Sequence, residues 1–364
     1  MGVHDPALSK SGDTSQASVN VLDSLRKLSK NFFLRKFLQA VLTILAVSTL
    51  IFFLIRLMPG NPLEIMTEQI IQAENIPRDV AYARAAATLN FDPDASVIDQ
   101  YFEWLGNLLR FDFGTSITSP GTRVIDEIAR FLPWTLFAVG AGLVISFTLG
   151  SFLGMVMAYY RNSIIDHVLS IIASALTGVP NYIWGLIIII VFGIHLRWFS
   201  VGDIRGTYSP SLTAGFNLPF ILDILKRAAL PVFIYVISTL GTWMLSMKSS
   251  TMSVQGEDYV NVARARGLSS RRIMTAYVGR NAMLPLFTQL TISIGFVLGS
   301  GVVIEEIFVY WGLGHYLFAS ITTRDYTSMQ GVFFILTASV VFANFFADML
   351  YGQLDPRVRI TGDD

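Results

Sequence analysis

Six long stretches of the chain are almost continuously apolar, and each is about as long as a helix that crosses a lipid bilayer. Helices that show no polar face along their length are typical of membrane spans rather than of the surface of a soluble domain. The third stretch is interrupted by Gly178-Val179-Pro180, which predicts a kink because proline removes a helix hydrogen bond. The predicted spans are residues 37–57, 134–159, 164–196, 230–247, 286–308 and 331–351.

The distribution of lysine and arginine predicts which ends of the spans face the cytoplasm. Short cytoplasmic loops of membrane proteins carry an excess of basic residues. With six spans, the basic residues before span one and after spans two, four and six all lie on the same side of the membrane. This distribution predicts that both termini are cytoplasmic. Lys226 and Arg227, on the opposite side, depart from this pattern. The residues that set the orientation are Arg26, Lys27, Lys30, Arg35, Lys36, Arg161, Lys248, Arg264, Arg266, Arg271, Arg272, Arg280, Arg357 and Arg359.

The segment between the first two spans, residues 59–133, is long and acidic and contains no lysine. Within it, residues 81–89 and 97–109 have the composition of short helices. Connections of this length without structure of their own are uncommon in compact proteins. The segment is therefore predicted to form a small helical cap outside the membrane.

Composition supports a membrane protein and removes several kinds of chemistry. Of the 364 residues, 53% are hydrophobic and 14% charged, whereas soluble domains carry about 25% charged residues. The net charge of zero gives no indication of nucleic-acid binding. The sequence has no cysteine, and its four histidines form no H-E-x-x-H motif, so thiol chemistry and that metal site are excluded. No G-x-x-x-x-G-K-S/T motif is present to bind nucleotide phosphates.

The segment between the fourth and fifth spans, residues 256–285, predicts two short helices joined by a turn. Tyr259, Val262 and Ala263 fall at positions i, i+3 and i+4 and therefore share one face of the first helix. Gly267 is placed to end that helix, because glycine adopts the left-handed conformation of a helix C-terminus. A pair of helices of this kind can dock into a groove of another protein.

The ends of the two predicted helices carry matching signals. Glu257 and Asp258 stand in the first turn of the first helix, where the helix dipole favours acidic side chains. Ser269 or Ser270 can cap the second helix. Pro285 is predicted to close the approach to the fifth span.

This segment resembles the EAA loop of ABC-importer permeases, in particular of the oligopeptide/dipeptide permease B family, whose members serve peptides, nickel and some oligosaccharides. Gly267 and Pro285 are eighteen residues apart, a spacing similar to that of the peptide branch rather than the maltose branch. Of the three EAA positions, Asn261-Val262-Ala263, only the last is alanine. Further matches follow in the family's order: 57–62 (LMPGNP), 104–108 (WLGNL), 112–116 (DFGTS), 132–136 (LPWTL), 312–314 (GLG), 324–326 (RDY) and 354–357 (LDPR).

The resemblance implies an all-α polytopic membrane protein with the six-helix fold of type I ABC-importer permeases. It divides the chain into a cytoplasmic tail (1–36), a first span with the outer segment (37–133), a five-helix core (134–351) containing the coupling loop (248–285), and a second tail (352–364). The implied partners are a second permease, two ABC ATPases that hold ATP and Mg²⁺, a solute-binding protein and membrane lipid. The residues implied in ATPase coupling are Glu257, Asp258, Tyr259, Val262, Ala263, Arg264, Ala265 and Gly267. Among them, a small residue at Ala263 and a turn at Gly267 are expected to matter sterically.

The sequence leaves alternatives open for the cargo and for the residues along its path. Peptide is the leading expectation, with oligosaccharide and nickel as alternatives. The broken third span and the acids at the end of the fifth predict candidate path residues, although a packing kink, an interfacial aromatic belt or simple solvation explains them equally. These candidates are Gly178, Pro180, Asn181, Tyr182, Glu305 and Glu306.

Two other classes of protein compete with an ABC permease. A secondary transporter would carry ionisable residues deep in its spans, and almost none occur there. A membrane enzyme would carry a paired nucleophile and base or a set of metal ligands, and neither pattern is visible.

Overall fold

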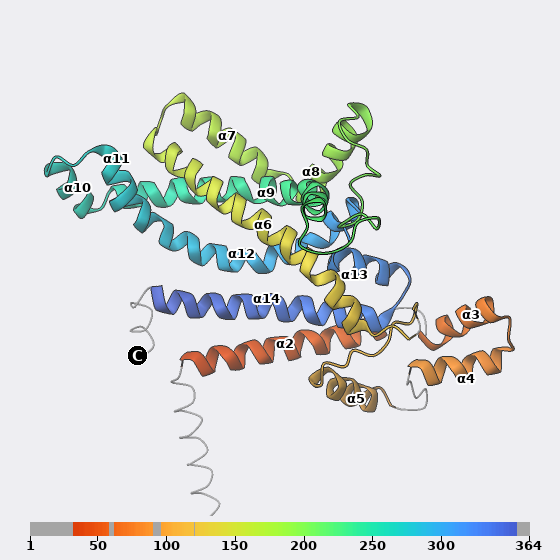
Figure 1. The fold of residues 1–364 in the computed structure, drawn as a ribbon. Helices are drawn as coiled ribbons and strands as arrows, with labels where there is room; N and C mark the ends of the chain where they lie inside the picture. Colours follow the sequence, from red (N-terminus) through yellow and green to blue (C-terminus); the bar gives the residue numbers. More distant parts are fainter. Residues whose placement is uncertain (1–31, 58–61, 90–95, 120, 355–364) are drawn as a thin grey trace, which may run out of the picture.

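The computed structural model describes residues 32–57, 62–89, 96–119 and 121–354, and within these ranges the chain is helical without a β-strand (Figure 1). Most of the predicted tails, 1–36 and 352–364, lies outside the described residues. The helices are α2 (Phe32–Arg56), α3 (Pro62–Glu74), α4 (Arg78–Leu89), α5 (Val97–Leu109), α6 (Val124–Tyr159), α7 (Ile164–Gly178), α8 (Asn181–Ile188), the π-helix η1 (Ile189–His195), α9 (Leu218–Gln255), α10 (Asp258–Ala265), α11 (Ser270–Arg272), the π-helix η2 (Ile273–Gly279), α12 (Arg280–Ile307), α13 (Leu313–Thr322) and α14 (Tyr326–Leu354).

Three helices, α2, α6 and α14, are long and apolar enough to cross a membrane, and the bent pair of α7 with α8–η1 is a fourth candidate. These four correspond to the first, second, sixth and third predicted spans. The fourth and fifth positions are occupied by α9, with 38 residues, and α12, with 28. At 1.5 Å per residue they are about 57 and 42 Å long, which suffices to span a bilayer. The all-helical membrane fold is confirmed, and the count of six spans stays a prediction.

The break in the third span is confirmed. Helix α7 ends at Gly178, Val179 is extended with φ −103° and ψ 124°, and Pro180 stands at the N-terminal cap of α8. The two halves meet at 98°. The cause is local, because a residue that precedes proline is disfavoured in the α conformation.

Several helices begin well before the apolar runs that predicted them. Helix α6 starts at residue 124 rather than 134, with Arg123 at its N-terminal cap and the Arg123–Asp126 ion pair at 2.9 Å beside its first turn. Helix α9 starts at residue 218 rather than 230, and the Asn217 side chain caps it. Polar caps and first-turn charges extend a helix beyond the membrane, so apolar length alone underestimates it.

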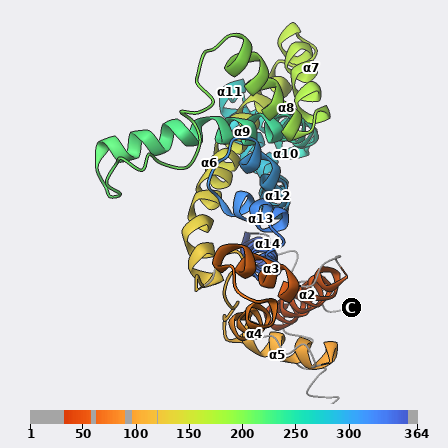
Figure 2. The ribbon, with the colours of Figure 1, turned by 90° about the vertical axis from the view of Figure 1, so that its right-hand side faces the viewer.

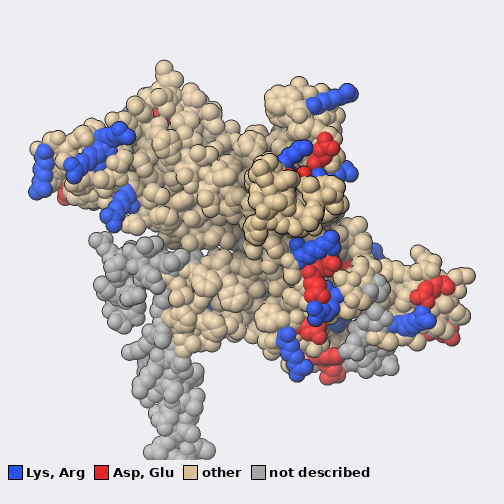
Figure 3. Space-filling view, in the orientation of Figure 1, with Lys and Arg blue, Asp and Glu red and all other residues tan. Residues whose placement is uncertain are grey.

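Charged side chains gather at the two ends of the molecule, with an apolar belt between them (Figure 3). Helices α2 and α14 run antiparallel along this belt, and the rings of Phe33 and Phe345 lie 5.5 Å apart near the start of one and the end of the other. That end also carries α10 and α11 (Figure 1). On α9, Arg227 pairs with Asp223 at 3.0 Å, so one of the two basic residues that broke the charge pattern is neutralised locally. The cytoplasmic orientation itself stays a prediction.

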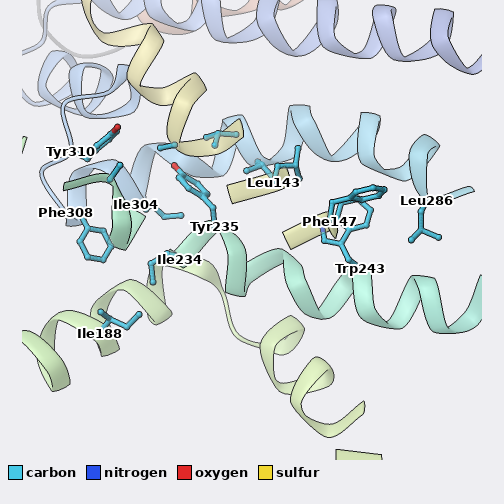
Figure 4. Packing of buried hydrophobic residues seen from close by; sticks show 14 of the residues in the cluster. Leu143, Phe147, Ile188, Ile234, Tyr235, Trp243, Leu286, Ile304, Phe308 and Tyr310 are labelled. Atoms are coloured by element: carbon cyan, nitrogen blue, oxygen red, sulfur yellow. The ribbon is translucent and has the colours of Figure 1, made fainter. Parts of the chain in front are cut away.

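The contact between α6 and α9 forms the centre of the core (Figure 4). Tyr235 and Trp243 of α9 are each only 1% exposed, and Trp243 meets Phe147 of α6 edge-to-face at 5.1 Å. Glycines on α6 allow this approach, since a Cβ on Gly142 would overlap Tyr235 and one on Gly150 would overlap Trp243. Small residues allow helices to pack closely in a membrane, where van der Waals contact drives association.

We expect the substitution Gly150→Val to destabilise the protein by about 2 kcal/mol, because overpacking a close helix contact forces backbone shifts. The matched control is Gly140→Val on the same helix, where a Cβ would meet no atom within 4 Å. Thermal unfolding of the detergent-solubilised protein measures both. Equal effects of the two substitutions would show that valine acts through helix propensity and not through the α6–α9 contact.

The outer segment forms a helical cap, as predicted (Figure 2). The two predicted helices are present as α4, which begins three residues earlier at Arg78, and α5. Helix α3 was missed, because it is short and its few apolar residues are buried by α14 rather than by lipid. Leu63 and Met66 of α3 pack with Tyr326 and Met329 of α14, so the cap rests on the end of the helix bundle.

A buried carboxylate fixes the cap to the bundle. Asp325, 1% exposed, precedes α14 and accepts a hydrogen bond from the Ser328 backbone N–H at 3.0 Å, in the manner of an N-cap. It also accepts from the hydroxyls of Ser116 at 2.5 Å and Thr118 at 3.2 Å. Tyr316 approaches the same cluster, with its hydroxyl 2.8 Å from that of Ser328, and burial raises the pKa of Tyr316 to about 12. Two sequence motifs that lie some 209 residues apart therefore meet through one side chain.

Candidate functional site

The segment between α9 and α12 contains the predicted glycine turn. Helix α10 runs from Asp258 to Ala265 with Glu257 at its N-terminal cap position, and Gly267 follows with φ +75°. Ser269 occupies the next N-terminal cap position, although its side chain makes no capping hydrogen bond. A Cβ on Gly267 would meet no atom within 4 Å. The predicted turn is present, and it needs glycine for its left-handed backbone rather than for space around a Cβ. Its role in coupling stays a prediction.

Pro285 was predicted to close the approach to the fifth span, but the second helix of the segment is not interrupted there. It continues from α11 through η2 into α12, so that Pro285 lies inside α12. The Ser250 hydroxyl on α9 donates to the Ala282 carbonyl at 2.7 Å in this stretch. The predicted coupling segment is thus one short helix attached to the continuous start of α12.

The three residues predicted to share one face of α10 differ in burial. Val260 and Ala263 are 0% and 3% exposed and pack in one cluster with Ile273 and Val278 of η2. Tyr259 and Val262, which were placed on the same face as Ala263, are exposed. Valines occupy both 260 and 262, so apolar spacing in an eight-residue helix does not choose between the two faces.

A hydrogen-bonded clamp joins α10 to the start of α12. The Asn281 amide donates to the Tyr259 hydroxyl at 2.9 Å and to the Tyr277 carbonyl at 2.7 Å. An open groove of about 590 Å³ lies beside the clamp, with Tyr259 on its rim and Leu284 and Phe287 along its wall. Tyr259 is therefore held in place by its hydroxyl while the residue stays 40% exposed.

The remaining predicted coupling residues lie on the outer surface of the same segment. Glu257, Asp258, Arg264 and Ala265 are exposed, and the basic side chains of this end form the blue cluster over α10 and α11 in Figure 3. The structure thus brings together an exposed apolar pair, Tyr259 and Val262, with acids at the start of α10 and arginine at its end.

An ion pair that sequence reasoning missed joins α7 to the end of α9 that leads into α10. Lys248 Nζ lies 2.5 Å from Asp166 Oδ1 and donates to the Ser170 hydroxyl at 3.0 Å. The Asp166 side chain is only 6% exposed and also accepts from the Asn162 backbone N–H at 3.1 Å. The two charges are 82 positions apart in the chain (248 − 166), so only the fold pairs them.

We expect Lys248→Met to destabilise the protein by about 1–3 kcal/mol, because it leaves a largely buried carboxylate without its cation. Adding Asp166→Asn is expected to recover part of the loss, so that the two substitutions are not additive. Thermal unfolding of the four combinations measures this coupling. The control Lys226→Met removes an exposed lysine from the same helix, and a loss as large as that of Lys248→Met would contradict the ion-pair interpretation.

The residues predicted to line a path lie on two different parts of the fold, the break between α7 and α8 and the end of α12. Gly178 and Pro180 form the break between α7 and α8, Asn181 and Tyr182 begin α8, and Tyr182 is 43% exposed. Their role in a path stays a prediction. Glu306 lies elsewhere, at the end of α12, where its carboxylate is 2.7 Å from His315 Nδ1 and partly exposed.

Glu305 faces the protein interior and caps a helix, and its role in a path stays a prediction. Its side chain is fully buried, and its carboxylate accepts from the Thr135 hydroxyl at 2.6 Å and from the backbone N–H groups of Gly314 at 2.7 Å and His315 at 3.3 Å. A Cβ on Gly312 would overlap the carboxylate. The Gly-Leu-Gly sequence at 312–314 is the signal for this cap, because only glycine leaves room for an acid at the start of α13.

Comparison with known proteins places these features in a family. The family of binding-protein-dependent transport system inner membrane components matches residues 150–360. The di/tripeptide transport system permease protein DppB of Pseudomonas aeruginosa is 31% identical over 339 residues, which cover 90% of this chain and 98% of that protein. The oligopeptide transport system permease protein AppB of Bacillus subtilis is 31% identical over 90% of this chain and 99% of its own length. The dipeptide permease DppB of the same organism is 29% identical over 90% and 98%.

Proposed function

The chain belongs to the family of binding-protein-dependent transport system inner membrane components, and on this basis we propose that it forms one half of the path of a peptide importer driven by partner ATPases. Family membership removes the alternative of a secondary transporter. The high coverage of relatives named as peptide permeases supports peptide as the cargo, ahead of oligosaccharide or nickel.

The observation that carries the proposal is the exposed apolar pair on α10. Tyr259 and Val262 are 40% and 51% exposed on a helix that is otherwise fixed to its own chain through Val260 and Ala263. An exposed aromatic ring held by its hydroxyl loses little conformational entropy on binding, which favours it as an anchor in an interface. We propose that this pair enters a groove of an ATPase.

Helix α10 is connected so that a displacement would pass into the spans. It follows α9 after a two-residue gap, packs against η2, and is clamped to α12 by Asn281. Ser250 joins α9 directly to α12. When the ATPases close on ATP and Mg²⁺, which they and not this chain would hold, movement of α10 would shift α9 and α12 together. The second permease would complete the path, and a solute-binding protein would deliver cargo to the opposite end.

This proposal places both termini and α10 in the cytoplasm and the α3–α5 cap outside. The shared end of α2, α14 and α10 supports the arrangement, since an even number of spans returns the chain to the side where it began (Figure 1). The excess of arginine around α10 and α11 supports the cytoplasmic assignment of that end.

Uptake by the reconstituted importer tests the proposal. The chain is assembled in liposomes with a second permease, two ATPases and a solute-binding protein, and labelled tripeptide, maltooligosaccharide and nickel are offered in turn. ATP-dependent uptake of the tripeptide alone is expected. Uptake of either other cargo in its place would contradict the peptide assignment, and uptake without ATPases would contradict the importer assignment.

A further inference from the structure

A second groove, of about 480 Å³, opens between the end of α6 and the α10–η2 segment. Its lining is mixed: Leu268 and Ile273 contribute apolar surface, Gln255 contributes polar surface, and Tyr159, Arg161 and Arg264 also line it. The exposed pair Tyr259 and Val262 does not line it. The groove is therefore separate from this pair and shares only Arg264 with the predicted coupling residues.

The two arginines on the rim are available for an anion. Neither Arg161 nor Arg264 forms an ion pair with any other residue that the structure describes, and no described carboxylate lines the groove. By contrast, Arg123 and Arg227 are both paired with aspartates of their own helices or caps. Two guanidinium groups at one groove match a phosphate group in charge and in hydrogen-bonding geometry.

The position of the groove indicates where the anion comes from. Arg161 stands two residues after the end of α6, a candidate span, so the rim lies at the level of lipid headgroups. Tyr159 is 45% exposed there, as is typical of an aromatic residue at a membrane interface. Phe152 and Leu149, which are 63% and 47% exposed, continue the same face of α6 toward the apolar belt. This apolar track would accommodate an acyl chain below a phosphate held at the rim.

We propose that this groove binds the phosphodiester headgroup of an anionic glycerophospholipid, with its acyl chain along α6. An acidic segment of a partner protein would satisfy the arginines equally, but it would not use the apolar track that leads into the belt. A lipid in this groove would connect the end of α6 to α10, because its phosphate would contact both Arg161, which follows α6, and Arg264, which belongs to α10. The inference rests on the proposed cytoplasmic position of α10 in one respect only, which is that the lipid comes from the cytoplasmic leaflet.

Lipid retained by the purified importer tests this site. The complete complex is extracted in mild detergent, and bound phosphatidylglycerol is counted by mass spectrometry for the wild type and for Arg161→Gln. A juxtamembrane arginine contributes about 1 kcal/mol to binding of an anionic lipid, so the variant is expected to retain the lipid about fivefold more weakly. Arg161 lies outside the coupling segment, so this readout does not depend on ATPase docking or transport.

The matched control is Arg271→Gln, which removes an exposed arginine from the same end without lining the groove. Retention as low as that of Arg161→Gln would overturn the proposal in favour of a diffuse surface charge. Equal retention by the Arg161→Gln variant and the wild type would also overturn it. Full displacement of the lipid by glycerol 1-phosphate would identify a free-phosphate site instead, and recovery of lipid only after ATPase removal would identify a protein segment as the natural occupant.

Discussion

Replacing Gly267 with valine is expected to reduce ATP-driven uptake by at least tenfold while the protein is still inserted in the membrane. The φ of +75° at this position is available to glycine, costs other L-residues about 1–2 kcal/mol, and is a genuine outlier for a β-branched residue. A cost of about 2 kcal/mol corresponds to roughly a thirtyfold change in the population of the turn. Since the turn fixes the angle between α10 and η2, its loss would displace the proposed ATPase contact.

The decisive control is Gly267→Asn, because asparagine tolerates the left-handed conformation far better than valine does. No atom lies within 4 Å of a Cβ at this position, so the asparagine side chain has room. Uptake near that of the wild type is expected for asparagine and an intermediate value for Gly267→Ala. Uptake and the level of protein in the membrane are measured together. Normal uptake by the valine variant would contradict the coupling role of α10, and equal loss with asparagine would show that volume and not backbone conformation matters.

Local sequence signals predicted the helical skeleton well. Apolar length located the long helices, Pro180 located the break between two halves that meet at 98°, and Gly267 located the turn at the end of α10. Each of these signals acts within a few residues, where steric rules on the backbone dominate. Helix α3 escaped because its apolar residues, such as Leu63 and Met66, are buried by α14 rather than by lipid.

The candidate site was only partly predictable, because its deciding contacts are long-range. Val260 and Val262 are chemically identical, and only the packing of η2 determines that the first is buried and the second exposed. Glu305 looked like an acid near a path, yet its hydrogen-bond partner Thr135 is 170 positions away. A single sequence does not reveal such pairings unless a local pattern, here the glycines before α13, requires them.

The cap around Glu305 leads to the prediction with the largest effect on stability. Glu305 lies on α12, accepts from Thr135 on α6, and accepts from the first N–H groups of α13, so one carboxylate joins three helices. Thr135 Oγ1 in turn accepts from the Leu313 N–H at 2.7 Å. Glu305→Leu would leave these buried donors without an acceptor, at about 1–3 kcal/mol for each. A total loss of about 3 kcal/mol or more in the free energy of unfolding is expected.

Glu306 provides a matched control on the neighbouring residue. Its carboxylate is partly exposed and faces His315, so Glu306→Gln is expected to cost less than about 1 kcal/mol. Glu305→Gln keeps the shape of the side chain but turns one acceptor into a donor, and should fall between the two. Thermal unfolding in detergent ranks the three variants. If Glu305→Leu unfolded like the wild type and lost only transport, the acid would belong to the path after all. A buried helix cap requires that Glu305→Leu lowers the free energy of unfolding and that Glu306→Gln leaves it nearly unchanged.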